Sequence, residues 1–201
     1  MKIILKNIKK LYLKTPKWKT IKKKKILVKK PWLVVAQEKI RLPNKQTIAP
    51  YYQIESPSYV EIIPLNKKSQ VLLNLKYKHG VRGASLGFPS GYMERGESPT
   101  RAGKRELHEE TGLASKKWRY LGGHTIDGNR GQAKAHFLMA LDCKERNRGT
   151  EIFSDDLDPG IHFWVSSSVL WKLLDLGYFK TLGAAFAVQI LLNNQKRKNR
   201  I

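Results

Sequence analysis

The segment GYMERGESPTRAGKRELHEETGL, residues 91–113, contains the helix on which the assignment of this chain depends. Ser98 and Pro99 favour a helix start, because a serine hydroxyl accepts a hydrogen bond from an unpaired amide and proline fits the first turn. Gly112 favours a helix end, because glycine adopts the left-handed conformation at little cost. We therefore predict a helix over residues 99–111.

Three glutamates of this predicted helix share one face. Glu106 precedes Glu109 by three positions and Glu110 by four, and residues at that spacing are neighbours on a helix. Like charges so close together repel, so the cluster needs either solvent or a cation. Mg²⁺ takes oxygen ligands and is usually held by one or two carboxylates together with substrate phosphates. A hard divalent cation is thus the functional interpretation, and a solvated acidic surface is the alternative.

The glutamates belong to a longer pattern, G-x5-E-x7-R-E-U-x-E-E-x-G-U, in which U is an aliphatic residue. The segment fits this pattern at every specified position, namely Gly91, Glu97, Arg105, Glu106, Leu107, Glu109, Glu110, Gly112 and Leu113. The pattern is the Nudix box, and the chain resembles a Nudix hydrolase. The resemblance implies an α+β fold, specifically a Nudix-type α/β/α sandwich with a mixed central sheet and an N-terminal β-hairpin extension.

The resemblance also assigns roles to the box residues. Glu106, Glu109, Glu110 and the Ser90 carbonyl would bind Mg²⁺, with Mn²⁺ as a substitute. Arg105 and Glu97 would fix the geometry of that site, and the catalytic set would be Glu109, Glu110, Arg105 and Glu97. Enzymes of this family hydrolyse a nucleoside diphosphate linked to another moiety, and bound metal neutralises the diphosphate and lowers the pKa of a bound water.

Around the box, hydrophobic patterning predicts the remaining elements. Strands are expected over residues 32–42, 47–54, 58–65, 71–77, 117–126, 133–142 and 162–166, and helices over 169–177 and 181–194. Residues 78–91 and 143–160 are expected as loops. We predict a Nudix hydrolase domain over residues 31–194, with its N-terminal strands over 31–56, and a basic tail over 195–201.

The order of these segments resembles the ADP-ribose and ADP-sugar pyrophosphatase branch of the family. That resemblance implies hydrolysis of ADP-ribose or a related ADP-sugar to AMP and a sugar phosphate. It also implies a homodimer in which strands from residues 31–56 exchange between subunits. Trp32, Tyr51 or Tyr52 would then stack on adenine, although packing in the core or at the interface is the favoured alternative for each. Arg82 and Arg130 would contact phosphates, and a solvated surface position is the favoured alternative for both.

Some features of that branch are missing. Its members tend to carry a glutamate two places before the proline of the F-P-x-G element, where this chain has Gly87. They often carry a proline about sixteen residues after the box, which is absent here. A later loop supplies a glutamate that positions the attacking water, whereas the corresponding segment offers Glu151 and three aspartates, Asp155, Asp156 and Asp158. Two alternatives therefore stay open: an RNA 5′ pyrophosphohydrolase, and a Nudix module that binds a nucleotide sugar without cleaving it.

The charge of the chain is concentrated at its start. The formal net charge is +23, and residues 1–30 hold thirteen lysines and no acid. We expect this extension to be poorly ordered or a short basic helix, with a linker at residues 22–25, and to be dispensable for catalysis. Such a concentration of positive charge attracts polyanions, so nucleic acid or an anionic surface is a candidate partner. Solvated lysines are the simpler interpretation.

A single cysteine, Cys143, rules out an internal disulfide and favours a reducing, cytoplasmic setting. No apolar run is long enough to predict a transmembrane helix.

Overall fold

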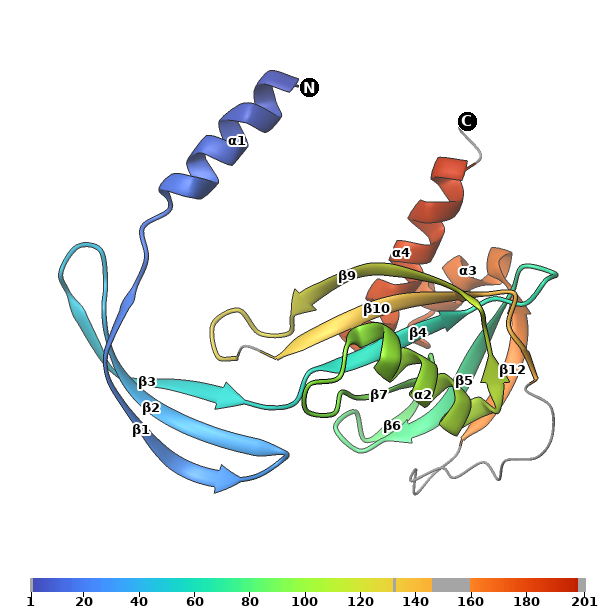
Figure 1. Cartoon of the computed structure of the whole chain (residues 1–201), viewed down its shortest axis with the longest axis horizontal. Coiled ribbons are helices and arrows are strands. Elements are labelled where there is room, and N and C mark those ends of the chain that lie inside the picture. Colours follow the sequence, from blue (N-terminus) through green and yellow to red (C-terminus); the bar gives the residue numbers. More distant parts are fainter. Residues whose placement is uncertain (1, 132, 146–159, 199–201) are drawn as a thin grey trace. The chain divides into compact units, whose positions relative to one another are not determined.

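The computed structural model describes residues 2–131, 133–145 and 160–198 (Figure 1). The chain divides into two compact units. The first, which we call the N-terminal unit, comprises Met1–Ser56 with Asp127–Gln132, and the second, which we call the sandwich unit, comprises Pro57–Ile126 with Ala133–Ile201. The strands expected within residues 31–56 thus belong to the same compact unit as the lysine-rich segment before them.

The N-terminal unit consists of a helix, α1 (Lys2–Lys14), followed by an antiparallel sheet of order β1-β2-β3. The strands are β1 (Lys19–Lys29), β2 (Leu33–Arg41) and β3 (Thr47–Glu55). The predicted turn between β2 and β3 is confirmed, and the Leu42 amide donates to the Gln46 carbonyl across it. The extension therefore has a third strand in addition to the expected hairpin.

The lysines at positions 22–25 lie in β1 rather than in a linker. Lys22 pairs with Lys39 and Lys25 with Ala36, so the run hydrogen-bonds along β2. β1 is an edge strand, and lysines are common on edge strands because their charge prevents pairing with another chain. Sheet pairing overrides the preference of a charged run for coil in this segment.

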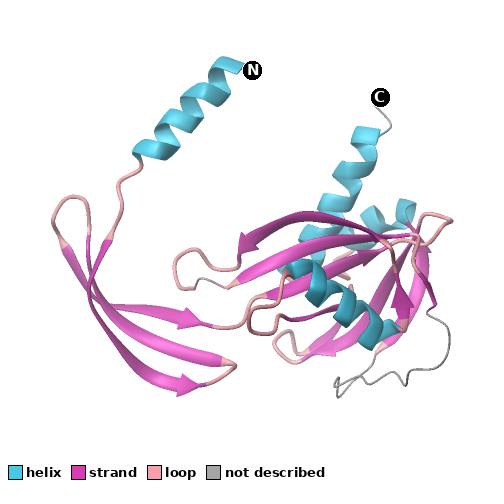
Figure 2. Cartoon of the chain, viewed as in Figure 1, coloured by secondary structure: helices cyan, strands magenta, loops and turns pink. Residues whose placement is uncertain are grey.

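The sandwich unit contains the mixed sheet β7-β4-β10-β9 and the antiparallel sheet β12-β5-β6 (Figure 2). The first sheet is formed by β4 (Tyr59–Pro64), β7 (Ser90–Tyr92), β9 (Lys117–Thr125) and β10 (Lys134–Leu141), in which β4 and β10 run parallel. The second is formed by β5 (Gln70–Lys78), β6 (Gly83–Gly87) and β12 (Ile161–Ser166). A short pair joins β8 (Leu113–Ala114) to β11 (Lys144–Glu145).

Helices cover both faces of these sheets. They are α2 (Pro99–Thr111), α3 (Leu170–Asp175), which follows the 3₁₀ turn Ser167–Val169, and α4 (Leu182–Lys198). Successive side chains of a strand point to opposite faces, and β4 shows the consequence. Val60 and Ile62 pack with Leu107 of α2, whereas Ile63 packs with Val188 of α4. The predicted α/β/α sandwich with a mixed sheet is confirmed.

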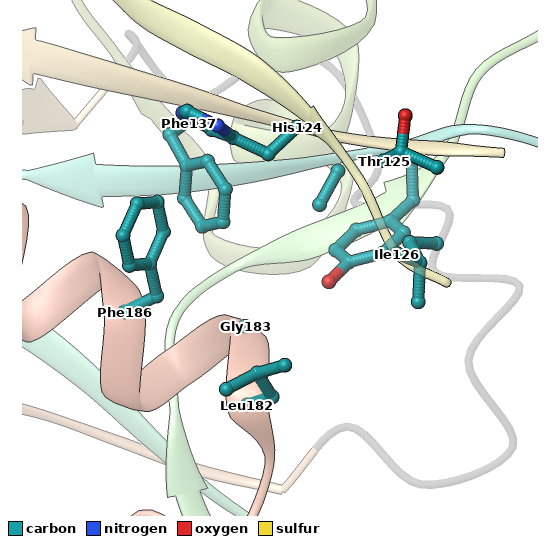
Figure 3. Close-up of a pocket in the computed structure, with 9 residues that line it drawn as sticks. His124, Thr125, Ile126, Phe137, Leu182, Gly183 and Phe186 are labelled. Carbon is teal, nitrogen blue, oxygen red and sulfur yellow. The ribbon is translucent and has the colours of Figure 1, made fainter. Parts of the chain in front are cut away.

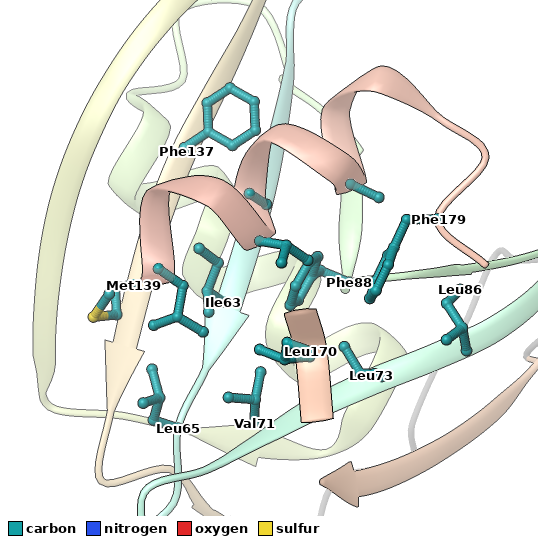
Figure 4. Packing of buried hydrophobic residues seen from close by; sticks show 14 of the residues in the cluster. Ile63, Leu65, Val71, Leu73, Leu86, Phe88, Phe137, Met139, Leu170 and Phe179 are labelled. Atoms are coloured by element: carbon teal, nitrogen blue, oxygen red, sulfur yellow. The ribbon is translucent and has the colours of Figure 1, made fainter. Parts of the chain in front are cut away.

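The larger core lies on the α4 side of the sheet. Figure 4 shows Ile63, Leu73, Phe88, Leu170 and Phe179 gathered there, and the rings of Phe88 and Phe179 stack with their centroids 6.0 Å apart. Sequence patterning predicted both C-terminal helices but placed no strands in residues 78–91. This segment contains β6 and β7, which are short and glycine-rich and carry no clear alternation. Most of the expected loop over 143–160 falls outside the described residues.

Candidate active site

Helix α2 has the ends that its sequence predicts. The Ser98 hydroxyl accepts a hydrogen bond from the Arg101 amide, at 3.4 Å. Gly112 ends the helix with φ of 67°, and its amide donates to the His108 carbonyl. Ala102 and Leu107 are fully buried on the sheet side. The buried side of α2 thus fixes the rotation of the helix and the direction in which its glutamates point.

Arg105 lies at the centre of the acidic cluster. Its guanidinium donates to both carboxylate oxygens of Glu97, at 3.3 and 3.0 Å, and to the Tyr92 carbonyl, at 3.0 Å. The same group contacts Glu106 at 2.7 Å and Glu109 at 2.9 Å. The hydrogen bonds with Glu97 are the main reason that the pKa of Arg105 is raised. Burial would raise the pKa of Glu97, but the Arg105 and Glu94 hydrogen bonds outweigh it and hold the pKa below its usual value.

Glu106 and Glu110 both lie against the backbone of β7. The Ser90 amide donates to Oε1 of Glu110 at 3.3 Å. A β-carbon on Gly91 would overlap the carboxylate of Glu106. Because Gly91 has no side chain, this carboxylate can approach the main chain closely. Ser90, Glu106 and Glu110 are therefore brought together, whereas the Glu109 side chain is 39% exposed and is held by Arg105.

Lys76 of β5 is a further cation at this site. Its Nζ lies 3.3 Å from Oε2 of Glu110, and the two side chains are only 6% and 7% exposed. Removing either charge from such a buried pair leaves the other without its counter-ion, which is costly in a medium of low polarity. Lys76 therefore helps to stabilise Glu110 in its ionised form.

The donors at β7 suit a hard divalent cation. Among the described residues, no three acidic, histidine or cysteine side chains converge as a metal cluster. Mg²⁺ does not need three, because it commonly takes one or two carboxylates and completes its shell with water and phosphate oxygens. Glu106 and Glu110 bring two carboxylates of this kind to the backbone of Ser90 and Gly91. Their fit rests on two nearly buried carboxylates and on a glycine whose missing side chain leaves room for one of them.

A polar cavity of about 360 Å³ adjoins this place and is lined by Tyr59, Lys78, Ser90, Gly91 and Tyr92. Lys78 gives it a positive charge, so the cavity offers a phosphate contact beside the carboxylates. Tyr59 also lines a second, more apolar cavity of about 270 Å³ (Figure 3). Its other walls include the rings of His124, Phe137 and Phe186, and the Phe186 centroid lies 5.1 Å from each of the other two.

A buried glutamate lies beside the same tyrosine. Glu61 of β4 is paired in register with Ser90 of β7, and a β-carbon on Gly183 of α4 would lie 2.5 Å from both the Glu61 carboxylate and the Tyr59 hydroxyl. Burial raises the pKa of Glu61 to about 8, which the positive charge of Lys78 partly opposes. Burial and the charge of Glu61 raise the pKa of Tyr59 to about 12.

The predicted substrate contacts are divided between the two units. Arg82 belongs to the sandwich unit and lies exposed in the turn between β5 and β6, with φ of 57°. Tyr52 and Arg130 belong to the N-terminal unit, where they line one cavity together with Trp18 and Tyr51. Trp32 is exposed between β1 and β2 of that unit. Glu151, Asp155, Asp156 and Asp158 lie outside the described residues.

Sequence reasoning missed three residues of the site, Lys76, Lys78 and Glu61. The lysines follow Asn74 at alternate positions in the strand VLLNLKYK, and that period of two places all three polar side chains on one face. Glu61 is the one acid in the strand YVEIIP. Such polar positions in otherwise apolar strands were the signal that could have identified them.

Comparison with known proteins agrees with this fold. The NUDIX domain family model matches residues 56–177. The chain is 27% identical over 154 residues to the ADP-ribose pyrophosphatase of Bacillus subtilis (strain 168), covering 77% of this chain and 82% of that protein. It is also 27% identical over 117 residues to the methanol dehydrogenase activator of Bacillus methanolicus, covering 58% of this chain and 63% of that relative.

A solved structure described as an ADP compounds hydrolase superposes with a TM-score of 0.79 at 19% identity, covering 92% of this chain and 98% of that one. This similarity concerns the fold. The family model covers more than half of the chain, including the whole box on α2 and its flanking loops. The chain therefore belongs to the Nudix family.

Proposed function

We propose that this protein hydrolyses the pyrophosphate bond of a nucleoside diphosphate linked to another moiety, with ADP-ribose or a related ADP-sugar as the first candidate. The observation that carries the proposal is the meeting of Glu106, Glu110 and Ser90 at β7, beside a cavity that contains Lys78. The similarity to an ADP-ribose pyrophosphatase supports the choice of substrate.

In this reaction a water oxygen forms a bond to one phosphorus and the bridging phosphorus–oxygen bond breaks, so that ADP-ribose gives AMP and ribose 5-phosphate. Mg²⁺ held by Glu106, Glu110 and the Ser90 carbonyl would neutralise the diphosphate and acidify a bound water. Lys78 binds a phosphate oxygen in the adjoining cavity. Arg105 keeps Glu97, Glu106 and Glu109 in place, and thereby fixes the acidic face before substrate arrives.

The aromatic cavity beside Tyr59 suits the planar base of the nucleotide. Its rings offer stacking surfaces, and Tyr59 borders both this cavity and the polar one. We therefore assign the base to the wall formed by His124, Phe137 and Phe186. This assignment, within the sandwich unit, replaces adenine stacking on Trp32 or Tyr52 of the N-terminal unit as our first choice.

A substrate panel tests the proposal. Purified protein with Mg²⁺ is incubated separately with ADP-ribose, ADP-glucose, NADH, diphosphoinositol phosphates and triphosphorylated RNA, and AMP and phosphate are measured by chromatography. Release of AMP from ADP-ribose supports the proposal, and the same reaction with the Glu110→Gln variant controls for contaminating hydrolases. Phosphate release from RNA alone would favour the alternative RNA activity, and tight binding of ADP-ribose without turnover would favour a binding module.

Two further properties are proposed from the sequence. Cys143 is a buried free thiol, and burial raises its pKa to about 11. Such a thiol is unreactive, which suits a reducing compartment, and we propose a cytoplasmic location.

A homodimer is the second proposal, and sedimentation equilibrium would test it. No helix among the described residues is long and apolar enough to cross a membrane.

A further inference from the structure

Helix α1 presents an uncovered apolar stripe. Ile4 and Leu5 precede Ile8 by four and three residues, and Leu11 and Tyr12 follow it by three and four, which places all five on one side of a helix. Each of these side chains is between 55% and 80% exposed. Every side chain from residue 4 to residue 32 is exposed, so the sheet of the N-terminal unit does not cover the stripe.

The opposite side of α1 is basic. Lys6, Lys10 and Lys14 are four residues apart, Lys9 lies beside them, and a helix of 3.6 residues per turn places this row about half a turn away from Ile8. Leu13 is an aliphatic residue that falls within this lysine row. The helix is therefore amphipathic, with an aliphatic face and a cationic face.

The positive charge continues beyond the helix and is hardly neutralised. Residues 15–30 add eight lysines, and the first acid in the sequence is Glu38. Among the described residues, Lys23 is the lysine of the first thirty positions that contacts an acid, at 2.8 Å from Glu55 and 3.6 Å from Glu38. The rest of this charge is available to an anionic partner.

We infer that α1 docks on an anionic lipid surface, with its aliphatic face among the acyl chains and its lysines at the phosphate headgroups. A helix with lysines on one face and aliphatic residues on the other lies in the plane of such an interface. Lysines close to an anionic leaflet strengthen the attachment, and salt weakens it. Nucleic acid would use the lysines, but it gives no reason for an exposed stripe that is aliphatic apart from Tyr12, because nucleic-acid sites stack bases on aromatic rings.

Vesicle co-sedimentation of the full-length protein tests this inference. Vesicles of phosphatidylcholine and phosphatidylglycerol in a 3:1 ratio are compared with pure phosphatidylcholine at low and high salt. We expect binding to the anionic vesicles, with weaker binding as salt rises, and at least about tenfold weaker binding to the neutral ones.

Two single substitutions on the same helix distinguish insertion of its aliphatic face into the membrane from purely electrostatic binding. Ile8→Ser removes an aliphatic group from the stripe and should weaken binding to anionic vesicles about tenfold, in line with the transfer free energy of one aliphatic side chain. Leu13→Ser makes a similar aliphatic-to-serine change within the lysine row and should change binding less than about twofold. Circular dichroism of both variants checks that the fold is retained.

Three results would overturn the inference. They are equal effects of the two substitutions, equal binding to neutral and anionic vesicles, and binding to a single-stranded RNA, measured by fluorescence anisotropy, without binding to vesicles. None of these outcomes depends on the hydrolase activity.

Discussion

Lys76 and Glu110 form a buried ion pair in which Nζ lies 3.3 Å from Oε2. Lys76 comes from β5 and Glu110 from α2, so the pair joins two layers of the sandwich at the proposed metal site. The ammonium group of Lys76 therefore supplies positive charge that stabilises this glutamate. Under the proposed function, metal binding at Glu110 would be linked to the stability of the fold through this contact.

Lys76→Met should destabilise the protein in the absence of divalent metal by about 3–5 kcal/mol, because Glu110 would lose its buried counter-charge. Mg²⁺ should restore more stability to this variant than to the wild type, since it would supply the missing positive charge. Urea unfolding with and without Mg²⁺ measures both effects. Lys68→Met, at an exposed turn, is the control, and an equal gain from Mg²⁺ in Lys76→Met and wild type would argue against the link.

Gly91→Ala should lower metal affinity about 10- to 100-fold, the range found when residues that orient metal ligands are changed. The new methyl group would displace the Glu106 carboxylate from the backbone of β7. Titration with Mn²⁺, followed by electron paramagnetic resonance, gives the affinity without any substrate. Gly80→Ala is a matched control, because no atom lies within 4 Å of its would-be β-carbon. Unchanged affinity in Gly91→Ala would remove Glu106 from the ligand set.

Glu110→Gln should reduce turnover by about 100-fold or more, a loss typical of removing one charged contact from an active site. The substitution keeps the size of the side chain but removes the charge beside Lys76, so circular dichroism checks that the variant is folded before its rate is compared. Glu94→Gln serves as the comparison, because its carboxylate is 72% exposed and lies 3.8 Å from Arg105. If Glu110→Gln turned over at nearly the wild-type rate in saturating Mg²⁺, the ligand assignment would be wrong.

Glu61→Gln should change how stability depends on pH. The folded state holds the proton of Glu61 up to a pKa of about 8, whereas the unfolded chain releases it near 4.5. Because the unfolded state binds fewer protons between these values, the free energy of unfolding falls as pH rises through that interval, by at most about 1.4 kcal/mol per pH unit from this group. Glu61→Gln should therefore show a shallower fall between pH 5 and pH 8.

Urea unfolding of both proteins across this pH range measures the difference. Asp175→Asn, an exposed acid at the end of α3, should leave the slope as in the wild type. Parallel slopes for Glu61→Gln and the wild type would mean that Glu61 is ionised in the folded protein.

The sequence determined helix α2, its caps and the identity of the box, because these depend on residues within one turn or two of each other. It also predicted most strands of the sandwich, whose alternation is strong. It failed where a segment becomes a strand through its pairing partner and not through its own pattern: the lysines at 22–25 pair with β2, and β6 and β7 pair with β5 and β4.

The composition of the site was likewise decided by tertiary structure. Nothing within the box indicates that Glu110 meets Lys76, which precedes it by thirty-four positions, or that Gly91 makes room for Glu106. Local spacing fixes which carboxylates share a helix face. Only the packing of α2 on the sheet decides which backbone, cation and cavity those carboxylates meet, because that packing joins residues through space and not through sequence.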